Sequence, residues 1–156
     1  MKGDPDIIEA LNEILTAELT AVNQYYVHAK MCENWGYKRL ASHLRNESIE
    51  EMKHADGLIE RILYFDGIPN MQRLNPIRVG ESVPEQHKLD LDLEVEAVIR
   101  LNKAIQLCHE KNDNGTREIL EDMLRQEEEA VDWTEAQLGI IEEIGKENYL
   151  AEQIHE

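Results

Sequence analysis

The sequence has little of what secreted, membrane or nucleic-acid-binding proteins need. Its two cysteines, Cys32 and Cys108, are too few for a disulfide framework and favour reduced thiols in a cytoplasmic protein. No apolar run is long enough to cross a membrane, and the first residues, MKGDPD, lack the apolar segment of a secretory signal. A net charge of −17 leaves no basic face for nucleic acid. We therefore expect a cytoplasmic protein with no nucleic-acid or membrane role.

The sequence is rich instead in acidic and helix-forming residues, and its length of 156 residues fits a single domain, 1–156. Apolar residues recur at spacings of three and four in four long segments, which is typical of amphipathic helices. On the third segment this spacing places Leu91, Val98 and Ile105 toward the core. The expected helices span about 5–35, 37–65, 82–111 and 115–144, with a short fifth helix over 147–154.

The connections between these segments predict their topology. The first and second helices are joined tightly, as are the third and fourth, so each pair is antiparallel. The segment 66–80 contains two prolines and no helical period. Fifteen extended residues reach about 50 Å, and a helix of this size is about 42 Å long. The sequence therefore predicts an all-α four-helix bundle with one long crossover loop.

Four glutamates stand on helix faces that should be apolar. They are Glu18, Glu51, Glu94 and Glu127, one on each long helix, and 33 residues separate both the first two and the last two. His54 follows Glu51 by one turn on the same face. A buried carboxylate is costly unless it is protonated, paired or bound to metal. Solvated edges of the apolar stripes are the other interpretation of these glutamates.

Carboxylates with an imidazole suit iron or manganese, and two bridging glutamates can hold two ions close together. Ferritin-like di-iron proteins carry one glutamate on each of two helices and Glu-x-x-His on each of the other two. Glu51 and His54 form one such pair. The matched position on the fourth helix, three residues after Glu127, is Ala130.

At several characteristic stretches the sequence resembles the bacterioferritins, and the resemblance covers essentially the whole chain. It is carried by MKGDP at the start, LTAELTAVNQY around Glu18, ESIEEMKHAD around Glu51, DGIPN in the crossover, and AVDWTEAQL and IGKENYL near the end. The resemblance implies a ferritin-like bundle in a hollow shell of 24 subunits built from twofold dimers. Such shells take up Fe(II), oxidise it with dioxygen or peroxide, and store Fe(III) mineral. A ferredoxin-type reductant is the partner implied for iron release.

The resemblance also implies roles for single residues. Glu18, Glu51 and His54 would bind the first iron, and Glu94 and Glu127 the second. Glu51 and Glu127 would also bridge the two ions. Tyr25 matches a tyrosine beside the di-iron site.

Met52 lies next to Glu51 and is therefore rotated about 100° from the core stripe, facing outward beside Ile49 and Ile59. Taken alone, it is an apolar residue in a subunit contact. The resemblance makes it a haem ligand, with two Met52 residues from two subunits holding haem b at a twofold axis.

Ala130 departs from the family pattern, which has histidine at this position. Glu128, Glu129 and Asp132 point well away from the missing ligand's direction. We therefore expect a second iron site that is weaker than the first, with water filling the gap, and ferroxidase activity that is reduced or lost.

Two alternatives follow for the function. The chain could be a haem-bearing electron-transfer subunit with little ferroxidase activity, sharing a shell with a second bacterioferritin subunit type. A relative of manganese catalase or rubrerythrin is disfavoured by the match at both ends of the chain and by the lack of paired Cys-x-x-Cys segments. The remaining histidines are expected at the surface or in interfaces: His28, His43, His87, His109 and His155.

Overall fold

The computed structural model describes all 156 residues and confirms the all-α prediction. The helices are α1 (Pro5–Trp35), α2 (Lys38–Tyr64), α3 (Val83–Glu110), α4 (Asn114–Ile144) and α5 (Lys146–Ala151). The prediction that the fifth helix extends to residue 154 is wrong, because its last residues turn more tightly. The N–H groups of Glu152 and Gln153 donate to the carbonyls three residues earlier, Tyr149 and Leu150.

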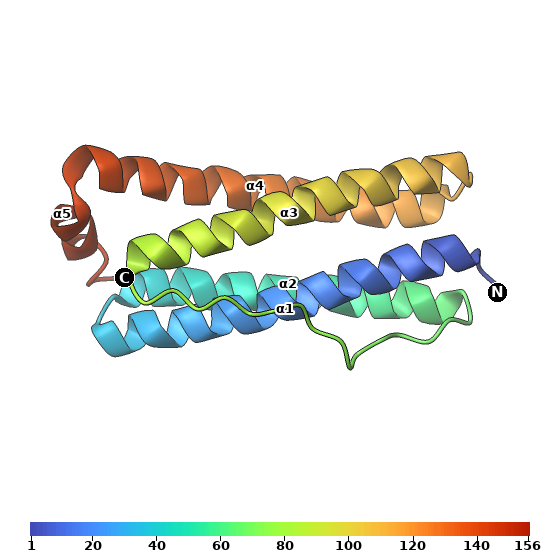
Figure 1. Cartoon of the computed structure of the whole chain (residues 1–156), viewed down its shortest axis with the longest axis horizontal. Helices are drawn as coiled ribbons and strands as arrows, with labels where there is room; N and C mark the ends of the chain where they lie inside the picture. The colour runs from blue at the N-terminus through green and yellow to red at the C-terminus, as the bar shows by residue number, and fades with distance from the viewer.

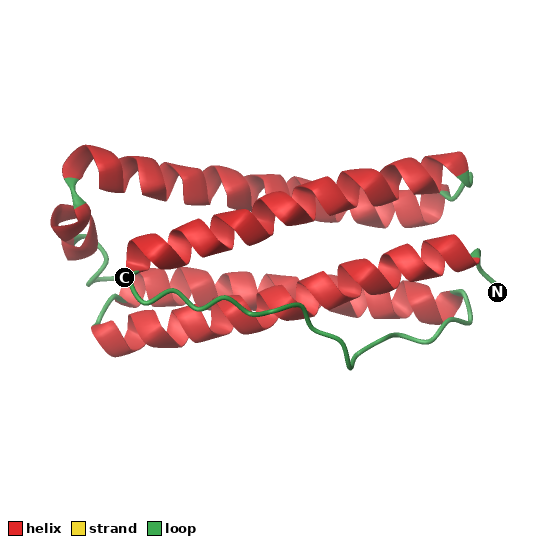
Figure 2. Ribbon diagram, in the orientation of Figure 1, coloured by secondary structure: helices red, strands yellow, loops and turns green.

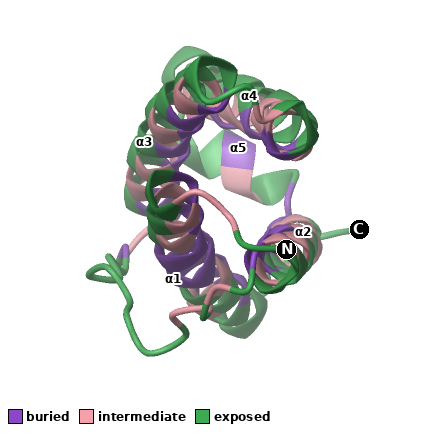
Figure 3. Ribbon diagram, turned by 90° about the vertical axis from the view of Figure 1, so that its right-hand side faces the viewer, coloured by how far each residue is buried: buried purple, intermediate pink, exposed green.

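The four long helices form two hairpins, α1 with α2 and α3 with α4, packed into one bundle (Figure 1). Seen along the bundle, buried residues line the inward faces of the long helices, and α5 lies across one end (Figure 3). None of the helices is both long enough and apolar enough to traverse a bilayer.

Local capping sets most of the helix boundaries. Asp4 accepts a hydrogen bond from the N–H of Asp6 at 2.8 Å, and Pro5 opens α1. Gly36 ends α1 with a φ of 89°, a left-handed conformation that suits glycine. Ser82 caps α3 through the N–H of Glu85. Each of these contacts gives a backbone group at a helix end a partner.

The crossover segment 65–82 runs along α1 from one end of the bundle to the other (Figure 2). Polar side chains at every fourth position of α1 bind this segment. At one end, Asn12 accepts from the N–H of Asn70 at 2.8 Å. At the other, His28 Nε2 accepts from the N–H of Gly80 at 3.0 Å. The full stripe is Asn12, Thr16, Thr20, Gln24 and His28.

The crossover explains why the surface prediction for His28 is wrong. His28 is 0% exposed, because the loop covers it and the residue accepts the loop's backbone hydrogen bond. Backbone polar groups without regular secondary structure need such partners when they approach a core. The histidine therefore holds the loop rather than facing solvent or a neighbouring subunit.

Two apolar clusters fill the bundle, one on each side of its middle. The larger contains fourteen buried residues near the α3–α4 turn, including Phe65 and Leu120. The smaller contains eight buried residues near α5, including Leu40 and Tyr149. Between these clusters the interior is polar, and the predicted ligand residues lie there.

Candidate metal centre

Four of the five predicted ligand residues meet at mid-bundle. Glu18, Glu51, His54 and Glu127 each offer one ligand atom, and these atoms all lie within 4.8 Å of one another. They come from α1, α2 and α4, and all four side chains are buried. Glu94 of α3 is also buried but lies outside this group.

The group contains buried polar atoms that have no hydrogen-bond partner. Such atoms are Oε2 of Glu18, Oε2 of Glu51, Nδ1 of His54 and Oε2 of Glu127, together with Oε1 of nearby Glu94. Burying a polar atom without a partner costs free energy. A cation at this point would satisfy carboxylate oxygens and an imidazole nitrogen together, so the donor set fits iron or manganese.

His54 is oriented by a residue that the sequence argument missed. Its Nε2 lies 2.8 Å from Oε1 of Gln126, while its Nδ1 lies 3.5 Å from Glu18 Oε2 and 3.7 Å from Glu51 Oε2. When Nε2–H donates to the amide oxygen, the Nδ1 lone pair faces the carboxylates. Burial lowers the pKa of His54, but the nearby Glu51, together with Gln126 and Glu50, outweighs burial and raises it.

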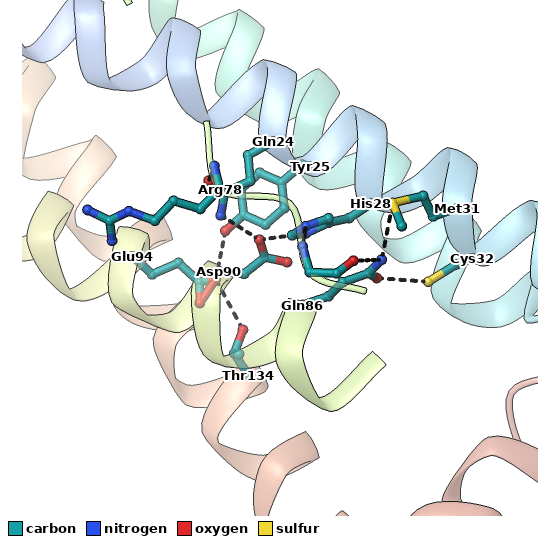
Figure 4. A network of polar contacts seen from close by, with 11 residues as sticks. Gln24, Tyr25, His28, Met31, Cys32, Arg78, Gln86, Asp90, Glu94 and Thr134 are labelled. Atoms are coloured by element: carbon teal, nitrogen blue, oxygen red, sulfur yellow. Dashed lines mark hydrogen bonds and ion pairs between the residues drawn. The ribbon is translucent and has the colours of Figure 1, made fainter. Parts of the chain in front are cut away.

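Glu94 is held away from the group by two donors (Figure 4). The hydroxyl of Tyr25 donates to its Oε2 at 2.6 Å, and that of Thr134 donates at 3.1 Å. Burial raises the pKa of Glu94 to about 8, although both hydrogen bonds act in the opposite direction. Tyr25 thus contacts Glu94 directly.

The charged form of Glu127 is disfavoured by its surroundings. Burial raises its pKa well above the ordinary value of 4.5, and the nearby charge of Glu51 raises it further. Buried carboxylates this close cannot all remain charged without a counterion. The metal-free centre therefore has to retain protons, which a bound cation would displace.

Position 130 has no substitute ligand on its own helix. Ala130 is half-buried, whereas Glu128, Glu129 and Asp132 are exposed, as their helical directions predicted. The helix that carries Glu127 therefore supplies a single ligand residue to the centre.

His87 does not lie at the surface, so that prediction is wrong for this residue. His87 is buried, with Nε2 3.1 Å from the hydroxyl of Tyr149, because α5 folds over this end of the bundle. His43 is mostly covered and stacks on Trp133 with ring centroids 3.6 Å apart. Burial lowers the pKa of both histidines to about 4. His109 and His155 are exposed.

A second polar network lies behind Glu94 and was not predicted. Asp90, one turn before Glu94, accepts from Gln24 Nε2 and lies 2.9 Å from His28 Nδ1 (Figure 4). Because His28 Nε2 accepts a hydrogen bond from the N–H of Gly80, its Nδ1 carries the proton. Nδ1–H therefore donates a hydrogen bond to Asp90. The sequence signal for this network was an aspartate four residues before an inward-facing glutamate on α3.

A cavity of about 180 Å³ links the centre to the outside of the bundle. Its inner wall includes Glu18, Glu51 and Glu127, and its outer wall includes Arg78 of the crossover and Glu96 of α3. Arg78 and Glu96 are half exposed and lie 3.7 Å apart. The cavity is large enough for several small molecules or a hydrated ion.

Met52 follows Glu51 on α2 but faces out of the bundle instead of into the centre. Its side chain is 43% exposed, and that of Ile49 is 47% exposed, while Ile59 is partly buried. An exposed thioether on an apolar surface fits a soft ligand for haem iron. The outward direction expected for Met52 is therefore seen in the structure.

The fold and this centre define a four-helix bundle with a buried carboxylate–histidine group that could hold a metal ion. Comparison with known proteins identifies the family. Residues 8–144 match the family model described as ferritin-like domain. A bacterioferritin of Mycolicibacterium paratuberculosis is 47% identical over 152 residues, covering 97% of this chain and 96% of that protein. A Streptomyces coelicolor bacterioferritin is 46% identical, with 100% and 93% covered, and one from Brucella melitensis is 43% identical, with 96% and 92% covered. The chain belongs to the bacterioferritins, within the ferritin family.

Proposed function

We propose that this protein stores iron, and that each subunit oxidises Fe(II) at the centre formed by Glu18, Glu51, His54, Glu94 and Glu127. The observation that carries the proposal is the convergence of buried carboxylate and imidazole atoms that have no protein partner. Membership of the bacterioferritins supports the same chemistry. Iron is the substrate and also the stored product.

The oxidation of Fe(II) needs no further reductant, because Fe(II) itself supplies the electrons. Two Fe(II) ions lose one electron each, and dioxygen takes up both electrons with two protons to give hydrogen peroxide. Hydrogen peroxide can itself accept two electrons from two further Fe(II) ions and two protons from solvent, giving two water molecules. The raised pKa values of Glu94 and Glu127 mean that binding cations releases protons at the same point.

The two iron positions differ in this proposal. The first has Glu18 and His54 beside the bridging carboxylates, whereas Ala130 leaves the second without an imidazole. Carboxylates alone bind Fe(II) less tightly than a set that includes histidine. We therefore expect the first ion to bind tightly, the second to bind weakly, and oxidation to be slowed.

Haem b belongs to the proposal through Met52. Two copies of the chain related by a twofold axis would each present an exposed Met52 sulfur to one haem iron. Haem held between these residues supplies one-electron transfer across the shell. The surrounding apolar surface, including Ile49, would bury the porphyrin edge.

The assembly proposed is a shell of 24 subunits built from such dimers, reduced by a ferredoxin-type partner for iron release. The net charge of −17 favours attraction of Fe(II). Cys32 and Cys108 are both buried and free, which fits the reducing cytoplasm.

Ala130 favours one alternative function, a haem-bearing subunit that shares a shell with a second, complete subunit type. In that arrangement the chain alone would oxidise little iron. Native mass spectrometry of shells purified from the source organism separates the two functions. A single subunit type that oxidises iron briskly excludes the mixed shell.

Stopped-flow oxidation of Fe(II) tests the main proposal. The purified shell should bind Fe(II) without oxygen and oxidise it when mixed with dioxygen or peroxide. Glu51→Ala should lose at least about tenfold in rate, while the exposed control Glu128→Gln should match the unmodified protein. Equal rates in the Glu51→Ala variant and the unmodified protein would contradict the proposed centre. An absorption spectrum, with Met52→Leu as the haem-free control, tests haem binding independently.

A further inference from the structure

Glu47 is a carboxylate of α2 that the proposed centre does not use. Its side chain is only 24% exposed, although a glutamate on a solvated helix face would be mostly open. Its Oε1 lies 3.8 Å from Nε2 of His43, which is too long for a hydrogen bond. Burial lowers the pKa of His43 to about 4, so this imidazole is neutral at neutral pH and gives Glu47 no counter-charge.

The packing of α2 against α4 places Glu47 opposite Ala130. Glu47 is one turn from Glu51 and one turn from His43, on the same face of α2. Ala130 is likewise one turn from Glu127 and one turn from Trp133, on the same face of α4. Glu51 meets Glu127 in the metal group, and His43 stacks on Trp133. Between these two contacts, Glu47 and Ala130 occupy the same level of the bundle.

The residues around this level need a cation. Oε1 of Glu94 and Oε2 of Glu127 are buried and have no partner. Glu47 lies one turn from Glu51, which meets Glu127 in the metal group, so it is close to one of the two residues proposed to bind the second iron.

We propose that Glu47 is a ligand of the second iron and occupies the coordination position that Ala130 leaves open. The inference rests on the proposed function, because it adds a residue to the same centre. A glutamate is long enough to reach from α2 into space that a methyl side chain on α4 does not fill. The second ion then has only carboxylate ligands, as some iron and manganese sites do.

Titration with Co(II) under anaerobic conditions tests this proposal without relying on activity. Visible absorption and calorimetry report how many ions each subunit of the intact shell binds. The unmodified protein should bind two, and Glu47→Gln should keep the first and weaken the second at least about tenfold. Glu129→Gln is the matched control, because it removes the same charge from an exposed position next to Ala130.

Two further variants distinguish a ligand from a remote charge or a folding defect. Glu47→Asp keeps the charge but withdraws the carboxylate by one methylene, so it should also weaken the second ion. The double variant Glu47→Gln with Ala130→His should regain the second ion through the added imidazole. Regained binding would show that the Glu47→Gln chain still folds around the centre.

The failures are distinguishable. If the unmodified protein binds fewer than two Co(II) ions, the paired centre of the proposed function is wrong, and the role of Glu47 falls with it. If the unmodified protein binds two and Glu47→Gln also binds two with equal affinity, only the role of Glu47 is wrong. Equal losses of second-site affinity in Glu47→Gln and Glu129→Gln would show a general charge effect and would contradict the role of Glu47 as a ligand.

Discussion

The two halves of the metal centre have matched glutamates but different surroundings. In the first half, Glu18 and His54 turn unpartnered atoms toward one another. In the second half, Glu94 is engaged by Tyr25 and Thr134. The same spacing along the chain therefore produces one half that is open to a cation and one half that is partly satisfied by the protein. Ligand identity and the donors around each ligand both decide how tightly a half binds.

The largest expected effect comes from making the first half resemble the second. His54→Ala removes the only imidazole of the centre, so first-site Fe(II) affinity should fall by more than about 100-fold. Anaerobic Fe(II) titration measures the loss. Retention of tight binding in this variant would show that the carboxylates alone hold the first ion.

A smaller loss is expected from removing the residue that orients His54. Gln126→Leu leaves the Nε2–H of His54 without its acceptor, so the ring can rotate or change tautomer. First-site affinity should fall about tenfold, with the helical content unchanged by circular dichroism. Gln126→Glu, which keeps an acceptor, should retain affinity, and equal losses in both variants would contradict the orienting role.

Giving the second half a histidine should narrow the difference between the halves. Ala130→His should increase the rate of Fe(II) oxidation severalfold, up to about tenfold. Stopped-flow absorbance measures the rate in the variant and in the unmodified protein. Equal rates would mean that the lack of a histidine at position 130 does not limit the rate of Fe(II) oxidation.

The last expected effect is on the stability of the metal-free protein. The pKa of Glu94 is raised from 4.5 to about 8, so the folded state binds this proton more tightly than the unfolded state. This contribution is complete below about pH 4.5 and is lost as pH rises toward about 8. Tm of the metal-free shell should therefore fall over this range, and less so in Glu94→Gln. Exposed Glu128→Gln should show the same slope as the unmodified protein.

The helices and the buried glutamates could be predicted because both follow from local rules. Aspartate at position 4, proline at position 5 and glycine at position 36 define the limits of α1. A period of 3.6 residues separates the inward face of each helix from the outward face. Glu18, Glu51 and Glu127 were inferred as inward-facing for the same reason. Their spacing placed them near the middle of helices of similar length.

The polar contacts between elements could not be predicted in this way. The stripe from Asn12 to His28 resembles a solvated helix face until the crossover lies against it. On α3 the predicted inward residues Leu91, Val98 and Ile105 are only partly buried. Asp90, Ala97 and Ala104 are buried instead, together with Leu101 and Cys108. The angle at which α3 packs against α1 and α4 determines this rotation, and periodicity alone does not report it.

The sequence by itself determined that the chain is a helical bundle with four inward glutamates, one Glu-x-x-His pair and an alanine at position 130. These are properties of single helices, because hydrophobic period and capping act within a few residues. Only the tertiary structure decided which atoms lack partners, that Tyr25 and Thr134 hold Glu94, and that Glu47 lies level with Ala130. Those facts depend on the register and angle between helices, which are set by packing over the whole core.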